Sequence, residues 1–305
     1  MKTLKKILAF MGWAFVGLFG LTVLGFFITL IVVVQRGMDD SGALSDESIE
    51  SKHAVGVVEL TGEIITANEF REKLRKAVKN DKLKAIVVSI DSPGGAVGAS
   101  EEMFQEIRRA SEKKPIVCAL GNIAASGGLY ASLGCQKVVV HRGTLTGSIG
   151  VIMMMPNVAG LIGDTGFKMN VIKSGRFKDT GSPFRTMEQP DRELMQQLVD
   201  TAHSQFVEAV AESRGLTVEN VQQFADGRII LGSQAVALGL ADEIGGIARA
   251  AKIALELAGD DGEPELVTQR KPSGVFALFE DLSESRLVQW LTSYGDLQLL
   301  YRAYP

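Results

Sequence analysis

A serine at a strand-to-helix corner is the residue of this sequence best suited to nucleophilic chemistry. Ser126 lies in the glycine-rich phrase 121–128 (Gly-Asn-Ile-Ala-Ala-Ser-Gly-Gly), between a strand-like run and the helix-compatible residues 129–133. Small neighbours leave its hydroxyl accessible, and amides at the start of a helix can stabilise negative charge that develops on a substrate oxygen. Ser126 is therefore a candidate nucleophile. The alternative is that it only caps the following helix, which is a commoner role for serine.

A serine hydroxyl is a weak nucleophile at neutral pH and needs a positioned base. The sequence has three histidines, none with an obvious orienting partner, and we interpret them as structural or surface residues: His53, His141 and His203. A lysine is then the base to consider, because burial lowers the pKa of an amine towards neutrality. Three lysines lie in or near one segment, and their spacing does not choose among them: Lys168, Lys173 and Lys178.

A second glycine-rich turn follows an earlier strand-like run. Residues 91–95 read Asp-Ser-Pro-Gly-Gly, in which proline fixes one dihedral angle and the glycines allow backbone conformations closed to other residues. Such a turn can present bare N–H groups at the carboxyl ends of parallel strands, where ligands of α/β sheets bind. Taken alone, it is also an ordinary turn.

These turns require a sheet and covering helices to position them. Short β-rich runs predict strands over 55–60, 85–90, 115–120, 137–141, 149–153 and 167–172. Apolar periodicity predicts helices around 70–78 and over 97–112, 194–210, 217–224, 232–238 and 246–258, with Gly215 ending the long helix. Alternating strands and helices indicate parallel βαβ units in an α/β domain.

The N-terminal region predicts a membrane anchor. Residues 7–34 form an apolar run of 28 residues without charge or proline, longer than the roughly 20 residues that span a bilayer. Lysines in residues 1–6 and acidic residues after the run predict a cytoplasmic N-terminus. We therefore expect an uncleaved signal anchor, an acidic tether over 35–52, a folded domain over 53–260 outside the cytoplasm, and a tail over 261–305 that is a docking arm or loosely ordered.

Composition excludes some functions. A net charge of −4 among 305 residues, without a long basic block, argues against a nucleic-acid partner. The only cysteines, Cys118 and Cys135, do not have metal-site spacing. They could form a disulfide in an oxidising compartment, but we favour two small buried residues.

Four phrases together resemble bacterial signal peptide peptidase A, in order and spacing: 91–95 (Asp-Ser-Pro-Gly-Gly), 124–128 (Ala-Ala-Ser-Gly-Gly), 144–151 (Thr-Leu-Thr-Gly-Ser-Ile-Gly-Val) and 174–179 (Ser-Gly-Arg-Phe-Lys-Asp). The resemblance covers roughly residues 53–258. It implies a serine peptidase with a Ser-Lys dyad, in which Ser126 is the nucleophile and Lys178 the base. It further implies that Ser148 hydrogen-bonds and orients the amine.

The resemblance also implies an oxyanion hole, an assembly and a substrate. The backbone amides of Gly95, with Gly94, and of Ser126 itself would surround the tetrahedral intermediate. The implied fold is a ClpP/crotonase-like α/β spiral that forms homo-oligomeric rings, for which we expect an octamer, with serine and lysine from neighbouring subunits. No metal or cofactor is implied. The implied substrates are cleaved signal peptides and other unfolded polypeptides at the bacterial inner membrane.

Three other readings stay open. A peptidase of the same fold could instead remove misfolded envelope proteins. A crotonase-like acyl-CoA hydratase could use Glu101 or Glu102, although coenzyme A is cytoplasmic. A non-catalytic membrane scaffold would be favoured by a buried salt bridge at Lys178.

Overall fold

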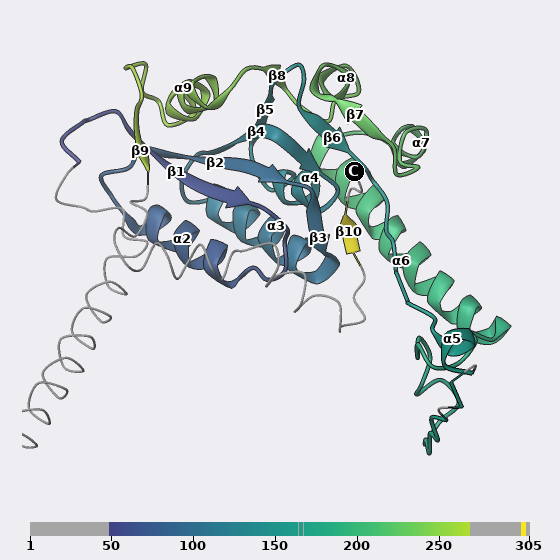
Figure 1. Ribbon diagram of the computed structural model, residues 1–305. Helices are drawn as coiled ribbons and strands as arrows, with labels where there is room; N and C mark the ends of the chain where they lie inside the picture. The colour runs from purple at the N-terminus through teal and green to yellow at the C-terminus, as the bar shows by residue number, and fades with distance from the viewer. Residues whose placement is uncertain (1–48, 164, 167, 269–299, 303–305) are drawn as a thin grey trace, which may run out of the picture. The chain divides into compact units, whose positions relative to one another are not determined.

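A mostly parallel sheet forms the centre of the part of the chain that the computed structural model describes, residues 49–163, 165–166, 168–268 and 300–302 (Figure 1). Its eight strands are β1 (Ala54–Thr61), β2 (Ala85–Ser92), β4 (Ile116–Ala125), β5 (Lys137–Val140), β6 (Leu145–Gly147), β7 (Ile229–Leu231), β8 (Glu243–Ile244) and β9 (Glu265–Thr268). A separate pair joins β3 (Gly94–Ala96) to β10 (Leu300–Arg302) in antiparallel orientation.

The sheet divides at β4. The strand order is β7-β6-β4-β2-β1-β9, and β5 also pairs with β4 and carries β8. The first half of β4, residues 117–120, pairs with β5, whereas its last residues, 123–125, pair with β6. Only β6 and β7 are antiparallel within this sheet. The predicted parallel α/β architecture is therefore confirmed at the level of a mixed α/β sheet.

Helices cover both faces of the sheet. The helices of the described residues are α2 (Asn68–Lys79), α3 (Val97–Ser111), α4 (Gly127–Ser132), α5 (Ala159–Gly163), α6 (Gln189–Arg214), α7 (Val218–Gln222), α8 (Gly232–Ala237) and α9 (Ile247–Leu257), of which α5 lies away from the sheet (Figure 1). Figure 1 shows α9 on one side of β1 and β2, and α2 and α3 on the other. The predicted helices are confirmed, and α6 ends as expected with left-handed Gly215 (φ 64°).

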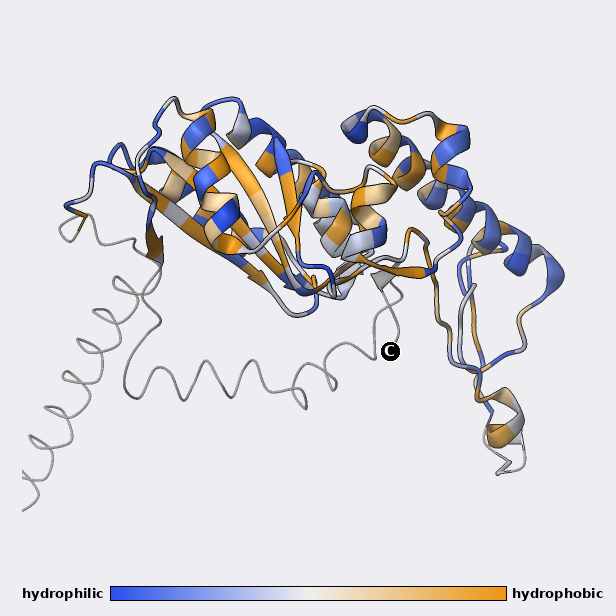
Figure 2. Ribbon diagram, turned by 90° about the horizontal axis from the view of Figure 1, so that it is seen from above, coloured by the Kyte–Doolittle hydropathy of each residue, from blue (hydrophilic) through white to orange (hydrophobic). Residues whose placement is uncertain are grey.

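Two apolar cores follow from the alternation of side chains along the strands. Val55, Val87 and Val117 pack with α9 on one face, whereas Ile86 and Val88 belong to the larger core on the other face. The strands of the sheet centre are accordingly strongly hydrophobic (Figure 2). Burial on both faces explains why these strands read as continuous apolar runs rather than as alternating ones.

Two predicted strands are absent. Residues 149–153 and the described residues of 167–172 form no strand, although both runs are apolar. The second run has no neighbouring strand to bury it: Val171 is 52% exposed and Ile172 fully exposed. Instead, the sheet continues through β6 and β7, which are too short to predict from composition.

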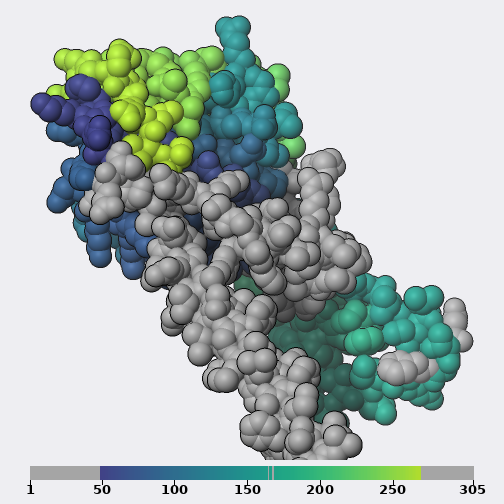
Figure 3. All heavy atoms as spheres, turned by 60° about the vertical axis from the view of Figure 1, so that its left-hand side comes forward, coloured from purple at the N-terminus to yellow at the C-terminus, as the bar shows by residue number. Residues whose placement is uncertain are grey.

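Residues on both sides of the predicted domain, 53–260, also pack against the sheet. Ile49 is buried in the larger core, and β9 adds a strand to the sheet next to β1. The His53 side chain at the beginning of β1 bonds to Asp260 before β9, with Nδ1 2.9 Å from a carboxylate oxygen. Figure 3 shows these two chain regions side by side.

The predicted anchor, residues 7–34, lies outside the described residues, as do most of the predicted tether and much of the tail. In the ranges that the structure does describe, none of the helices combines the length and apolar character needed to span a bilayer.

The two cysteines form a disulfide, contrary to the interpretation that we favoured. Cys118 lies in β4 and Cys135 follows α4, with Cα atoms 5.8 Å apart. Both residues are buried, as expected. Their pairing depends on α4 folding back along β4, which a sequence separation of 17 residues does not reveal.

Candidate active site

Ser126 occupies a strained corner between β4 and α4. Its φ of 51° lies in the left-handed region, where residues other than glycine are uncommon. The backbone is held on both sides, because its N–H donates to the Gly147 carbonyl (2.8 Å) and its C=O accepts from the Tyr130 N–H (2.8 Å). Strain of this kind persists only where the surroundings over-determine the conformation, and it gathers at functional sites.

The Ser126 hydroxyl is buried without a partner. The residue has no solvent exposure, and no group in the described part of the chain bonds its Oγ. Ser126 stands at the N-cap position of α4, yet its side chain makes no capping hydrogen bond. The alternative of a purely capping serine therefore lacks the interaction that defines a cap.

Glycines bring the turn after β2 against α4. A Cβ on Gly127 would lie 3.1 Å from the Gly95 nitrogen, and one on Gly128 would lie 2.8 Å from the Ser92 carbonyl oxygen. Gly95 itself lies so close to Ile64 that a Cβ would be 2.0 Å from the Ile64 carbonyl oxygen. These positions need glycine because the backbones touch, which explains how two distant phrases meet beside Ser126.

The amides near Ser126 are not equally available. The Gly94 N–H donates to Ser92 Oγ at 3.1 Å, and the Ser126 N–H is engaged by Gly147. The Gly127 N–H has no acceptor among the described residues, whereas Gly95 pairs with Tyr301 in the antiparallel β3–β10 ladder. Of the expected oxyanion donors, Gly94 and Ser126 use their amides within the fold, and Gly95 presents its amide to the edge of β3 that pairs with residues 300–302. The sequence reasoning missed Gly127, whose amide at the first position of α4 lacks an intrahelical partner.

Ser148 lies beside Ser126 at the same end of the sheet. Ala125 of β4 pairs with Gly147 of β6, and each of the two serines follows one of these residues directly. Ser148 also has a left-handed φ of 52°, is 6% exposed, and donates its N–H to the Arg228 carbonyl. The register thus brings together two residues that lie 22 positions apart in the sequence.

The lysines differ in their partners. Lys173 Nζ donates to the Arg176 carbonyl (3.0 Å) and to the Asp179 carboxylate (2.5 Å). Lys178 is exposed, and within the described residues its Nζ forms neither a hydrogen bond nor an ion pair. Lys168 is also exposed. Lys178 is not joined to Ser126 within one chain, because Ser126 Oγ has no partner.

The remaining candidate residues have structural roles. His203 Nε2 lies 2.8 Å from the Ala225 carbonyl oxygen, and His53 pairs with Asp260. Glu102 pairs with Arg71. No group of His, Cys, Asp or Glu side chains that could hold a metal ion occurs among the described residues.

Tyr130 shows how tightly α4 is packed behind the nucleophile. Its ring contacts Phe104 edge-on and Phe206 at a tilt, with centroids 5.5 and 4.9 Å apart. Burial, with a smaller effect of the Glu101 carboxylate, raises the pKa of Tyr130 to about 12. The phenol therefore stays neutral and belongs to the core that supports α4.

A serine with an unpaired hydroxyl at a strained strand-to-helix corner, beside the unpaired amide of Gly127, is typical of the class of serine hydrolases. The comparison with protein families then makes this specific: residues 108–260, half of the chain, match Peptidase family S49. The chain belongs to this family and is a serine peptidase of the SppA type.

Individual relatives agree with this assignment. A protein of Synechocystis sp. named as a candidate protease is 41% identical over 73% of this chain and 81% of its own length. A chloroplastic serine protease SPPA of Arabidopsis thaliana is 34% identical over 67% of this chain and 30% of its own length. A protein of Enterococcus faecium named as a candidate signal peptide peptidase SppA is 35% identical, over 66% and 61% respectively.

Proposed function

We propose that this S49 peptidase is a membrane-anchored serine endopeptidase with Ser126 as nucleophile and Lys178 as general base. The observation that carries the proposal is the buried, unpartnered Oγ of Ser126. Leaving a buried hydroxyl unpaired costs about 1–3 kcal/mol, so it is expected where function requires the group. The exposed Lys178 amine, without a salt bridge among the described residues, argues against the scaffold alternative.

The proposed reaction begins with proton transfer. The neutral Nζ of Lys178 takes the proton of Ser126 Oγ while Oγ bonds to the carbonyl carbon of the scissile peptide. The amides of Gly95 and Gly127 stabilise the resulting oxyanion. The Lys178 ammonium then gives its proton to the leaving nitrogen, the C–N bond breaks, and an ester on Ser126 remains. Water that the same amine deprotonates then attacks the ester carbonyl, the C–Oγ bond breaks, and the ammonium returns its proton to Ser126 Oγ. Ser148 keeps the amine oriented.

The edge of β3 supports a binding mode for peptides. The Gly94 carbonyl accepts from Ile64 N–H, and the Ala96 N–H donates to the Ile64 carbonyl. Alternation along the strand therefore directs the polar groups of Gly95 to the opposite edge. There residues 300–302 pair with β3 in antiparallel orientation. An extended substrate could bind to the same edge by strand addition, next to Ser126.

An oligomer would complete the site. The segment that carries Lys178 exposes several apolar side chains in the single chain: Met169, Val171, Ile172 and Phe177. A neighbouring subunit that covers this segment would bury the amine and favour its neutral form. We therefore propose a ring of ClpP/crotonase-like subunits, with an octamer as the expected size, in which one subunit supplies Ser126 and its neighbour Lys178.

The proposed location is the bacterial inner membrane, with residues 7–34 as anchor, a cytoplasmic N-terminus and the peptidase domain outside the cytoplasm. The Cys118–Cys135 disulfide supports this, because disulfides persist in oxidising compartments. The proposed substrates are cleaved signal peptides, in agreement with the name of the Enterococcus faecium relative.

Labelling with a fluorophosphonate probe tests the nucleophile directly. The purified full-length protein should be modified at Ser126, and Ser126→Ala should remove the label while the protein still assembles. Lys178→Ala should abolish both labelling and peptide hydrolysis, because the hydroxyl then lacks its base. A label on another serine, or hydrolysis that survives either substitution, would refute the assignment.

The substrate is tested in lipid vesicles. Vesicles that contain the enzyme and a synthetic signal peptide should lose the intact peptide faster than they lose an added unfolded protein of equal concentration. Faster loss of the unfolded protein would instead favour envelope quality control.

A further inference from the structure

An ion-pair network adjoins the proposed base. Asp179 follows Lys178 directly, and its carboxylate accepts from Arg185 Nη2 (3.0 Å) and from Lys173 Nζ. The other terminal nitrogen of Arg185, Nη1, donates to Asp191 Oδ2 at 2.5 Å. Arg185 thus connects the segment of Lys178 to α6. We name Asp179, Arg185 and Asp191 the carboxylate clamp.

The α6 end of the clamp is fixed. Asp191 is only 4% exposed and is the third residue of the helix. Its carboxylate also accepts from Thr180 Oγ1 (2.7 Å) and from the Glu188 N–H (3.2 Å). The far half of α6 packs into the larger core through Phe206 and Val210. The clamp therefore ties an exposed segment to an element that is anchored elsewhere.

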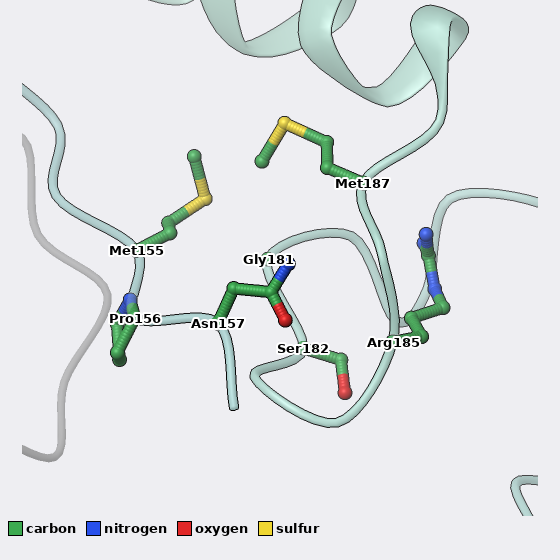
Figure 4. Close-up of a pocket in the computed structure, with 7 residues that line it drawn as sticks. All are labelled: Met155, Pro156, Asn157, Gly181, Ser182, Arg185 and Met187. Carbon is green, nitrogen blue, oxygen red and sulfur yellow. The ribbon is translucent and has the colours of Figure 1, made fainter. Parts of the chain in front are cut away.

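A small pocket lies next to the clamp, in a region where none of the described residues of 151–190 is buried. It is lined by two chain segments, residues 155–157 and residues 181–187, with Met155 and Met187 on opposite walls (Figure 4). Arg185 belongs to its lining. Because none of these residues belongs to an apolar core, the ion pairs of Arg185 are the contacts that fix the backbone near Lys178.

We propose that the carboxylate clamp positions Lys178 as a base in two ways: it fixes the backbone beside Lys178 on α6, and it keeps the Asp179 carboxylate occupied, away from the Lys178 amine. This inference rests on the proposed role of Lys178. Asp179, Arg185 and Asp191 are positioning residues, because none of them contacts the Ser126 hydroxyl.

The charges around Asp179 determine in which direction the loss of Arg185 would act on the Lys178 amine. Hydrogen bonds from Arg185 first, and from Lys173 next, lower the pKa of Asp179 to about 2, so the carboxylate is ionised at neutral pH. The Arg185 bond likewise lowers the pKa of Asp191. An ionised carboxylate that lost its arginine would be available to the adjacent Lys178 amine and would stabilise its charged form. A general base must be neutral at the working pH.

The experiment compares the acidic limb of the pH dependence of kcat/KM for a fluorogenic peptide, using the full-length protein in detergent. Arg185→Gln should lower kcat about 10- to 100-fold with little change in KM. It should also move the limb to higher pH by about one unit, because Asp179 then faces Lys178. Asp179→Asn should not move the acidic limb to higher pH. The double variant should return the limb to the wild-type pH.

A matched control is Arg176→Gln in the same segment. The Arg176 guanidinium lies over the Phe177 ring (5.3 Å) and is outside the clamp, so this variant should keep the wild-type limb. Arg185→Lys keeps the charge but not the paired donors, and should give a smaller shift than Arg185→Gln. It answers the same question if the glutamine variant does not assemble.

The failures of this inference and of the proposed function are distinguishable. If Lys178→Ala retains hydrolysis, the proposed base is wrong, and the clamp has nothing to position. If Lys178→Ala is inactive but Arg185→Gln keeps the wild-type limb, the clamp inference alone is overturned. A limb that moves upward equally in Arg185→Gln and in the double variant would also overturn it, because the carboxylate would then have no part in the shift.

Discussion

The corner that holds Ser126 and the segment that holds Lys178 differ in how completely one chain builds them. Ser126 is fully buried, its backbone is held by bonds to two elements, and close-packed glycines surround it. Lys178 is exposed on a segment that a few ion pairs tie to α6. The comparison teaches that a single chain preorganises the proposed nucleophile, whereas the proposed base would need another subunit to cover it.

The largest expected effect tests whether that cover is another subunit. Ser126→Ala and Lys178→Ala should each reduce peptide hydrolysis by at least about 1,000-fold. Co-expression of the two variants should restore about a quarter of wild-type activity, because random mixing gives that share of interfaces with both intact residues. Activity is measured on the purified mixed oligomer. If the mixture stays as inactive as its parents, serine and lysine do not come from different subunits.

A smaller effect is expected from crowding the Ser126 corner. Gly128→Ala places a Cβ 2.8 Å from the Ser92 carbonyl oxygen, which should force α4 away from the oxyanion turn. We expect kcat to fall about 10- to 100-fold and the free energy of unfolding to fall by about 1–3 kcal/mol.

The matched control for this variant is Gly98→Ala at an exposed position of α3, where a Cβ would meet nothing within 4 Å. It should keep full activity in the same kinetic and denaturant measurements. Equal activity of both variants would mean that the corner is less rigid than its contacts indicate.

Ser148 separates the role of a hydroxyl from that of a strained backbone. Ser148→Ala should lower kcat about 10- to 100-fold, as expected when an orienting partner of a functional group is lost. Ser148→Gly relieves the left-handed φ of 52° but also lacks the hydroxyl, so it should be equally slow. Steady-state kinetics of both variants distinguish the two roles. A Ser148→Gly variant with a wild-type kcat would show that the backbone conformation, and not the hydroxyl, is required.

The smallest expected effect concerns acid stability near Lys178. The folded-state pKa of Asp179 is lowered to about 2, below its unfolded value near 3.8. Its contribution to stability is therefore present above about pH 4 and is lost as pH falls towards 2. Thermal unfolding of wild type between pH 6 and 3 should show a steeper loss than that of Asp179→Asn. Parallel curves would mean that these ion pairs make no measurable contribution to stability, which is a common result for exposed ion pairs.

Sequence patterns predicted the buried parts of the fold well. The central strands β1, β2, β4 and β5 read as continuous apolar runs because helices cover both of their faces. The same criterion failed for 149–153 and for the described residues of 167–172, which are apolar but form no strand of the sheet. Apolar composition predicts that a segment is buried, but it does not predict which element packs against it.

The candidate site, like the fold, could be predicted from the sequence only in part. The corner residue Ser126 and the turn with Gly95 follow from local motifs. The availability of individual amides does not follow from motifs, because it depends on which carbonyl each N–H meets across the sheet. The Gly147 carbonyl accepts from the Ser126 N–H, whereas the Gly127 N–H has no partner among the described residues. The clamp also escaped prediction, since Arg185 and Asp191 carry no motif and matter only through their contacts with Asp179.

The disulfide has a topological consequence for the nucleophile. The closed loop from Cys118 to Cys135 contains Ser126 and the whole of α4. Closing a loop of this length restricts the unfolded chain by roughly 3 kcal/mol in the entropic account. Oxidation of the two thiols therefore constrains the chain segment that carries Ser126, although neither cysteine belongs to the proposed site.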